Sequence, residues 1–400
     1  MTSYRLHAAA IVSWIVLGTT GIALGGEALA VPTSGEALRA TLDGAANGKL
    51  RFKGAMGSRE LATDRLAIWG EFNEPMGARA VILSDGGLLV ASRVRIENEQ
   101  LLATSSLDRT TSLPLELVAG VIVRIPADRT LFDRWLARVL SAGGETDRLL
   151  LDNGDELTGA VAGLSESAVT LEAGGEKTEI AFDKLAIVIF NPALTHKSKP
   201  LGLRCLVGLA DGTRLIAVEF TADRDRARLK LAGGASFETA TDSIVCLQPL
   251  GGQAVYLSDL KPASFKHIPF LTLEWPYQND HTVLAGQLRA AGKLFAKGIG
   301  IHSPARITYE LPGTFERFES LVAVDAETNS RGSVVFRVFT DDGSGKLIER
   351  FTSPVVRGGD PALGVSVSVA GIKRLTLLVD YADRGDELDH ADWLNARLVR

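Results

Sequence analysis

The feature that most constrains the fold is a layout that recurs three times in the middle of the chain. In each copy an apolar run ends in a turn that closes on a glycine, a leucine follows three residues later, and a last apolar run stops at a proline. Asp-Gly and Asn-Gly between apolar runs favour tight β-hairpins, because both turn residues can adopt a positive φ. Each copy is therefore expected to form a small bent sheet or a miniature barrel of about four or five strands. The glycine and proline that bound the copies are Gly86 and Pro126, Gly154 and Pro192, and Gly212 and Pro249.

These copies set the expected domains. The first copy lies in an N-terminal β region, 31–126, the second occupies 147–192 and the third 203–250. A weaker segment at 42–70 lacks the glycine-to-proline spacing and is counted only as β structure. Glycine is abundant (41 residues) and methionine scarce (3), which is typical of short strands joined by tight turns. The chain is therefore expected to be mostly β.

One segment, 127–146, interrupts the β pattern between the first and second copies. Its apolar residues fall on one helical face and two glycines follow as a stop, which predicts a helical connector. The apolar stripe is interpreted as packing surface rather than a ligand site. Its members are Leu131, Trp135, Leu136, Val139 and Leu140.

The first thirty residues, 1–30, have the features of an export signal. Arg5 precedes an apolar run at 8–24, and Ala28-Leu29-Ala30 follows the A-x-A cleavage pattern. Threonines and glycines dilute the run relative to a spanning helix, so a cleaved signal is favoured over a retained membrane anchor. The mature chain is then expected to begin near Val31, outside the cytoplasm, and to be periplasmic, surface-bound or secreted without a membrane span.

The chain has two cysteines, Cys205 and Cys246, at the two ends of the third copy. In an oxidising compartment they are candidates for a disulfide between its first and last strands, and two buried free thiols are the alternative.

The net charge of the chain is −5. A net negative charge does not favour binding to phosphate backbones, which argues against nucleic acid as a partner.

The last part of the chain, 255–400, is a second β-rich module whose alternating and continuous apolar runs predict two packed sheets. Its two most specific landmarks are Lys297-Gly-Ile-Gly-Ile-His-Ser303 and Asp389-His-Ala-Asp-Trp393. This series resembles the NPCBM domain, a carbohydrate-binding module of bacterial secreted proteins. The resemblance implies a galactose-binding-like jelly-roll β-sandwich and, for some members attached to glycoside hydrolases, binding to terminal galactose-type sugars. Some related sandwiches also hold a structural calcium ion.

Sugar recognition needs aromatic faces together with planar polar groups that can pair with hydroxyls. In a jelly roll the first and last strands can pair, which would bring 275–280 close to 389–393. Structural alternatives stay open, among them core packing for Trp393, a structural histidine at His302 and a turn cap at Asp325. The candidate sugar-binding residues are Trp275, Tyr277, Asp280, His302, Asp325, Tyr381, His390 and Trp393.

An acidic run near the C-terminus includes Asp389 and Asp392 and has enough oxygen ligands for a calcium ion; a solvated acidic loop is the other interpretation. No other cofactor is indicated. The sequence contains no serine nucleophile elbow and no phosphate-binding glycine loop, and the copies leave little room for a sizeable glycosidase domain.

The sequence is therefore interpreted as an exported, non-catalytic carbohydrate-binding protein, in which the sandwich recognises a glycan and the copies act as a spacer or docking platform. Two alternatives remain open. One is a cell-surface structural protein without sugar binding, whose exposed sheet edges recognise protein partners. The other is a carbohydrate-active hydrolase with an unrecognised site.

Overall fold

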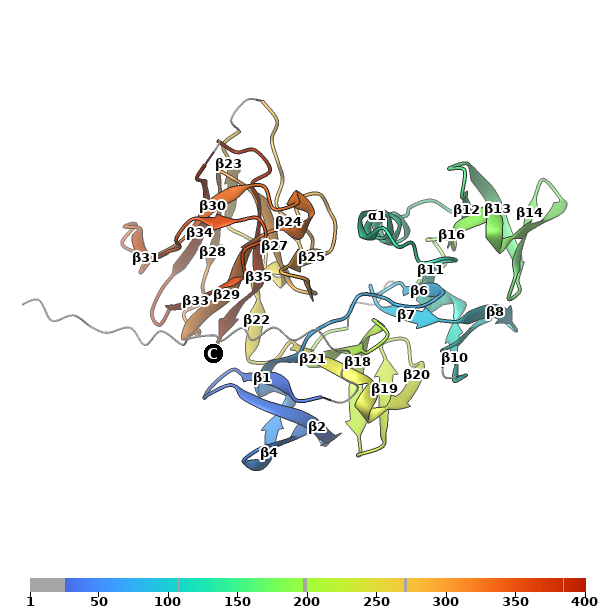
Figure 1. The fold of residues 1–400 in the computed structure, drawn as a ribbon, viewed down its shortest axis with the longest axis horizontal. Helices are drawn as coiled ribbons and strands as arrows, with labels where there is room; N and C mark the ends of the chain where they lie inside the picture. Colours follow the sequence, from blue (N-terminus) through green and yellow to red (C-terminus); the bar gives the residue numbers. More distant parts are fainter. Residues whose placement is uncertain (1–25, 107, 197–199, 270–271, 384) are drawn as a thin grey trace, which may run out of the picture.

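The computed structural model describes residues 26–106, 108–196, 200–269, 272–383 and 385–400. Most of the expected export signal lies outside this range. The described chain forms four small barrel-like units, barrels 1 to 4 in chain order, followed by a C-terminal β-sandwich (Figure 1). Among the described residues, no helix has the length and apolar character needed to span a membrane.

The four barrels share one strand plan. In each, the opening strand pairs antiparallel with both the second and the closing strand, and a single 3-10 turn precedes the closing strand. Barrel 1 comprises β1 (Ala28–Pro32), β2 (Leu38–Ala46), β3 (Lys49–Gly54), β4 (Gly57–Ala62), η1 (Thr63–Arg65) and β5 (Leu66–Gly70). Barrel 2 comprises β6 (Arg79–Leu83), β7 (Leu88–Ala91), β8 (Arg93–Glu97), β9 (Gln100–Thr104), β10 (Thr110–Pro114), η2 (Leu115–Leu117) and β11 (Val118–Ile122). Barrel 3 comprises β12 (Asp147–Leu151), β13 (Glu156–Leu164), β14 (Ala168–Ala173), β15 (Glu176–Ala181), η3 (Phe182–Lys184) and β16 (Leu185–Ile189). Barrel 4 comprises β17 (Arg204–Leu209), β18 (Arg214–Ala222), β19 (Arg226–Leu231), β20 (Ser236–Ala240), η4 (Thr241–Ser243) and β21 (Ile244–Leu250).

Barrel 1 is a complete copy of the layout, although the sequence spacing identified it only as β structure. Its closing strand ends at Gly70 rather than at a proline, so it lacks the marker that the other copies share. A glycine is required there because Gly70 has φ +78° and a Cβ would lie 1.8 Å from Val245 O of barrel 4. The residue that ends the barrel 1 strand is therefore determined by contact with barrel 4, and the closing proline that would have identified this copy from sequence spacing is absent.

The start of barrel 1 includes the last residues of the expected export signal. Ala28 pairs with Ala40 of β2, and Ala30 pairs with Trp69 of β5 and is fully buried. Cleavage after Ala30 would therefore remove the first three residues of β1.

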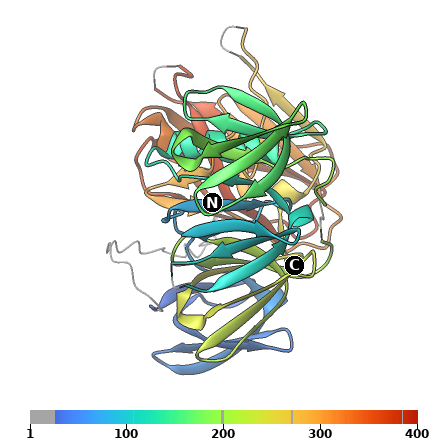
Figure 2. The same ribbon diagram turned by 90° about the vertical axis from the view of Figure 1, so that its right-hand side faces the viewer.

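The barrels associate in pairs through their closing strands. β5 pairs antiparallel with β21, which joins barrels 1 and 4, and β11 pairs antiparallel with β16, which joins barrels 2 and 3. One apolar cluster contains buried residues of all four barrels, including Trp69, Val81, Val188 and Leu247. Figure 2 shows the result, with barrel 3 in green at the top and barrel 1 in blue at the bottom of one continuous body.

The expected helix is confirmed as α1 (Arg129–Leu140), capped by Asp128, whose side chain accepts from the backbone N–H groups of Thr130 and Leu131. Its buried apolar residues are Phe132, Leu136 and Val139, which pack on β6, β11 and β16. Phe132 was absent from the predicted stripe, and Trp135 is only half-buried beside the same cluster. The opposite side of α1 faces the sandwich (Figure 1).

The C-terminal module is a sandwich of two antiparallel sheets, as expected. Its core contains the fully buried Trp393, Phe318 and Phe336. The first sheet consists of β24 (Gln278–Asn279), β27 (Gly298–His302), β35 (His390–Val399), β29 (Arg317–Val324) and β33 (Leu363–Ser368), with β22 (Ala254–Tyr256) beside β35. The second consists of β23 (Ser264–His267), β28 (Ala305–Glu310), β34 (Arg374–Tyr381), β30 (Ser333–Asp341) and β31 (Ile348–Thr352), with β32 (Val356–Arg357) beside β30. The 3-10 turns are η5 (Leu257–Asp259) and η6 (Ala326–Thr328), and a separate hairpin comprises β25 (Leu288–Ala290) and β26 (Lys293–Phe295).

The sandwich is docked on the barrels rather than joined to them by a free linker. Leu294 of the β25–β26 hairpin forms a β-bridge with Phe72, just after barrel 1, and packs against it. The buried hydroxyl of Tyr256 donates to Ala67 O of barrel 1 at 3.0 Å. Buried apolar and polar contacts together therefore fix the module against the barrels.

The structure contains no disulfide between Cys205 and Cys246, and both thiols are buried and free. The strand register explains this: Cys205 of β17 lies opposite Pro249 of β21, whereas Cys246 lies opposite Gly208. Because partners in register share a face and positions three apart in a strand do not, the two thiols lie on opposite faces of the sheet. Burial raises the pKa of Cys205 to about 12.

Candidate carbohydrate-binding site

A tryptophan lies over a histidine at one end of the sandwich. The Trp275 ring, in the segment between β23 and β24, is parallel to that of His302 within 5°, with ring centroids 5.1 Å apart. Trp275 is half-buried, so part of its ring remains accessible. Its backbone N–H donates to His267 Nδ1 at 3.3 Å, which anchors the segment to β23.

Three of the chain's six histidines meet at this point. His302 ends β27 and lies directly opposite His390, the first residue of β35, with ring centroids 5.6 Å apart. His267 comes from the other sheet, at the end of β23, and lies 5.7 Å from His302. The cluster thus joins both layers of the sandwich.

His302 is held as a neutral ring. Its Nδ1 donates to Ser303 O at 2.7 Å. Burial lowers the pKa of His302, the bond to Ser303 opposes this effect, and nearby His390 and His267 add to the lowering. A neutral imidazole that donates through Nδ1 presents Nε2 as an acceptor, which suits a hydroxyl donor.

Glu327 approaches the histidines from η6. Its Oε1 lies 3.5 Å from His390 Nδ1, and neither of these buried atoms has a hydrogen-bond partner; His267 Nε2 is in the same situation. Buried polar atoms without partners are costly. These polar atoms beside the partly exposed Trp275 ring are available to pair with the hydroxyls of a polar ligand.

Asp325 and Asp392 lie together behind Glu327, and each is 1% exposed. Asp325 caps η6 by accepting from Glu327 N at 2.7 Å, which realises the turn-cap alternative. Burial and the charge of Glu327 raise the pKa of Asp325 to about 6. Burial, together with the charge of Asp325, raises the pKa of Asp392 well above its usual value.

Asp389 has a different role from Asp392. Its carboxylate accepts from Ser303 Oγ at 2.6 Å and from Ser333 N at 2.7 Å, and thereby ties β27, β30 and β35 together beside the histidines. Burial raises its pKa to about 6. The two aspartates proposed as calcium ligands therefore do not converge, and within the described residues no group of three or more His, Cys, Asp or Glu side chains is arranged to hold a metal ion.

The other predicted residues lie apart from the cluster. Trp393 is fully buried against Phe336 and Phe318, so the packing alternative holds and its ring cannot stack on a ligand. Tyr277 packs against Phe265, with ring centroids 5.0 Å apart. The remaining two are Asp280, which accepts from Lys297 Nζ at 2.6 Å, and Tyr381, which is 51% exposed at the end of β34.

Sequence reasoning missed two members of the cluster, His267 and Glu327. His267 lies in a short connector and Glu327 in a 3-10 turn, where no periodicity marks a residue as inward-facing. Histidine is rare in this chain, with six residues, and three of them meet here. This rarity was the sequence signal that could have indicated His267 as a member of the site.

The C-terminal part of the chain is thus a two-sheet β-sandwich with an aromatic and histidine cluster at one end. Residues 253–399 match the family model described as the NPCBM/NEW2 domain, so this part of the chain is an NPCBM domain. The family resemblance inferred from the landmark motifs is thereby confirmed.

Individual relatives match only parts of the chain. A protein of Renibacterium salmoninarum named endo-alpha-N-acetylgalactosaminidase is 29% identical over 112 residues, which are 28% of this chain and 7% of that protein. A CBM51 structure from Clostridium perfringens GH95 in complex with methyl-galactose is 27% identical, with 36% of this chain and 99% of that chain covered and a TM-score of 0.32. The CBM51-2 and INT domains of Clostridium perfringens ZmpB, in complex with GlcNAc, are 26% identical, with 46% and 37% covered and a TM-score of 0.33.

Proposed function

We propose that this chain is an exported, non-catalytic carbohydrate-binding protein whose sandwich binds a glycan at the Trp275 end. The observation that carries the proposal is the partly exposed Trp275 ring, held parallel to the neutral His302. Aromatic faces bind the C–H faces of sugars, and neighbouring polar groups pair with the hydroxyls.

The surrounding groups suit a hexose with several hydroxyls. His302 Nε2 offers an acceptor, and Glu327 and His390 carry polar atoms that lack partners. The name of the Renibacterium relative refers to a galactosamine-type substrate, which favours a terminal galactose-type sugar as ligand.

The carboxylates of this region favour binding over hydrolysis. Glycosidases place two carboxylates about 5 to 9.5 Å apart in an open cleft. Here the neighbouring Asp325 and Asp392 are each 1% exposed, so a glycosidic bond cannot reach between them. The barrels would then serve as a platform that presents the module and can bind protein partners.

The test is a glycan array and a thermal-shift screen of the full chain, with calcium and with EDTA. A ligand that binds only the native state raises the melting temperature. Trp275→Ala is expected to abolish binding while the fold persists. Tyr381→Ala is the matched control, because it removes another exposed aromatic ring of the sandwich and leaves the Trp275–His302 pair intact. A well-folded chain that binds nothing on a broad array would refute the proposal and favour a protein-interaction role.

A further inference from the structure

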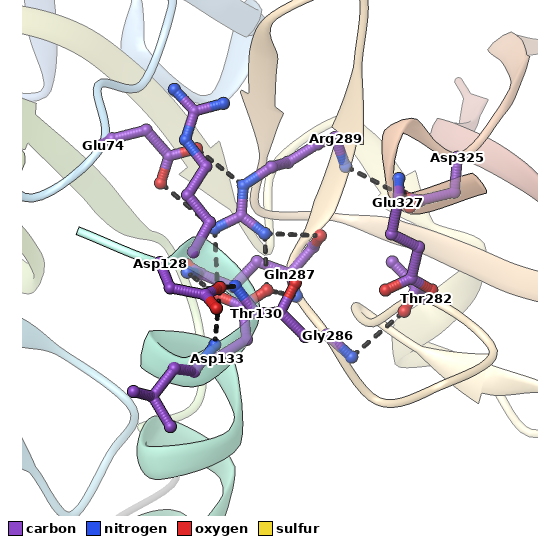
Figure 3. A network of polar contacts seen from close by, with 12 residues as sticks. Glu74, Asp128, Thr130, Asp133, Thr282, Gly286, Gln287, Arg289, Asp325 and Glu327 are labelled. Atoms are coloured by element: carbon purple, nitrogen blue, oxygen red, sulfur yellow. Dashed lines mark hydrogen bonds and ion pairs between the residues drawn. The ribbon is translucent and has the colours of Figure 1, made fainter. Parts of the chain in front are cut away.

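The sandwich and the barrels are joined by a buried network of charges centred on Arg289 of β25 (Figure 3). The Arg289 guanidinium donates to Asp133 of α1, with Nη2 at 2.9 Å from Oδ1. It also donates to Glu74, with Nε at 2.6 Å from Oε1 and Nη2 at 3.1 Å from Oε2. The side chains of Arg289 and Asp133 are 10% and 8% exposed, and charge-assisted bonds shielded from water in this way are among the strongest polar contacts in proteins.

Asp133 also holds the backbone of the module. Its Oδ2 accepts from Gln287 N at 2.9 Å, and its Oδ1 accepts from Gln287 Nε2 at 2.8 Å. A single carboxylate on α1, outside the NPCBM domain, therefore fixes both the side chain of Arg289 and the main chain next to it.

The same segment contacts the carbohydrate site from its other side. Arg289 N donates to Asp325 Oδ2 at 3.3 Å. At Gly286, a Cβ would lie 3.1 Å from Asp133 Oδ2 and 3.5 Å from Glu327 Oε2, so both carboxylates border the space beside this residue that a side chain would fill (Figure 3). Segment 286–289 is thus clamped between α1 and η6.

Asp325 links segment 286–289 to the histidine cluster through two hydrogen bonds. Its Oδ1 accepts from Glu327 N at 2.7 Å, and its own N–H donates to His390 O at 2.9 Å. The position of Asp325 therefore determines where both Glu327 and His390 lie.

We propose that Asp133 is a positioning residue of the carbohydrate site: by holding Arg289 and segment 286–289, it fixes Asp325 and, through it, Glu327 and His390. This inference rests on the proposed function. It makes the barrel half of the chain, which lies outside the NPCBM domain, a structural part of the site.

The experiment compares Asp133→Asn with Asp128→Asn in the full chain. Both changes remove one carboxylate charge from the region of α1, but Asn remains a good helix cap at 128, and the Asp128 side chain accepts from Thr130 N and Leu131 N within α1 itself. The first readout is the Kd for the glycan identified on the array. Asp133→Asn is expected to raise Kd by about tenfold, equivalent to 1.4 kcal/mol, and Asp128→Asn to leave it unchanged.

The second readout is amide hydrogen exchange, which needs no ligand. Asp133→Asn is expected to accelerate exchange in 286–289 and also in 325–328 and at 390. Faster exchange confined to 286–289, with 325–328 and Kd unchanged, would overturn the inference. If the wild-type chain bound no glycan, the proposed function would fail, while exchange at 325–328 would still decide whether Asp133 positions these residues.

Glu74→Gln provides a second variant in case Asp133→Asn does not fold. It weakens the hold on Arg289 but leaves the bonds from Asp133 to Gln287 in place. The expected result is a smaller rise in Kd and a smaller rise in exchange at 325–328, and no change in either would count against the inference.

Discussion

The buried carboxyl pair Asp325–Asp392 should make the stability of the sandwich fall as the pH rises. A single substitution should remove this dependence. Neither oxygen of Asp392 has a donor group within hydrogen-bond distance, and the neighbouring Asp325 is equally buried. Burial and the charge of Asp325 raise the pKa of Asp392, and the protonated form of Asp392 can donate to Asp325, whereas two ionised carboxylates would repel each other at a large cost.

The magnitude follows from linkage. The pKa of Asp392 is raised well above 3.8 in the folded chain, so the folded state binds more protons than the unfolded state as the pH rises past that value. Stability therefore falls with rising pH, by about 1.4 kcal/mol per pH unit, until the folded pKa is reached.

Asp392→Asn should abolish this cost. An asparagine amide donates to Asp325 as the protonated carboxyl does, but it needs no proton from solution. The variant is expected to match the wild type near pH 4 and to become progressively more stable than the wild type as the pH rises above that value.

The assay is denaturant unfolding of the full chain at about pH 4, 5.5 and 7, followed by tryptophan fluorescence, to which the buried Trp393 of the sandwich contributes together with the other tryptophans. Asp225→Asn, at an exposed aspartate of barrel 4, is the control and should change nothing. Parallel pH profiles for wild type and Asp392→Asn, or a variant less stable than wild type at pH 7, would refute the reasoning.

Three further outcomes are expected. Trp393→Ala should destabilise the sandwich by about 3–5 kcal/mol in denaturant unfolding, because it empties a closed core position; no loss would contradict its burial. Since Cys205 and Cys246 are free, dithiothreitol should leave the unfolding midpoint unchanged, and alkylation should require denaturation. A chain that starts at Val31 should unfold more readily than one that starts at Glu27, because it lacks the first three residues of β1; equal thermal stability would show that these residues are dispensable for the fold.

The fold could be read from the sequence wherever local chemistry determines it. Turn glycines and apolar runs predicted the barrels, and the apolar stripe followed by Gly143 and Gly144 predicted α1. Contacts between barrels could not be predicted in this way. Gly70, for example, is required because Val245 of barrel 4 approaches it closely. Of the two alternatives for Cys205 and Cys246, the structure has the free thiols, because strand register, and not membership of one barrel, decides which residues face each other.

The candidate site divides in a similar way. Residue type and the family landmarks pointed to Trp275, His302 and His390, and the pairing of β27 with β35 brings the last two together. Whether an aromatic ring faces the core or the outside depends on which face of the sheet its side chain lies on, and this is known only once the sandwich is packed. The sequence therefore could not distinguish Trp393, which lies in the core, from Trp275. Asp133 was beyond reach, because its partners lie more than 150 residues away in the chain.

The docking of the module bears on what the barrels do. A spacer would connect the sandwich through a segment with few contacts, whereas here Gln248 of barrel 4 donates to Asn395 of β35 at 3.0 Å in a buried bond, and Arg289 is held by residues outside the module on two sides. Breaking such contacts would leave buried charges unpaired, which is costly. The module and barrels should therefore move as one body, and a glycan bound at Trp275 would orient all four barrels relative to the surface that carries it.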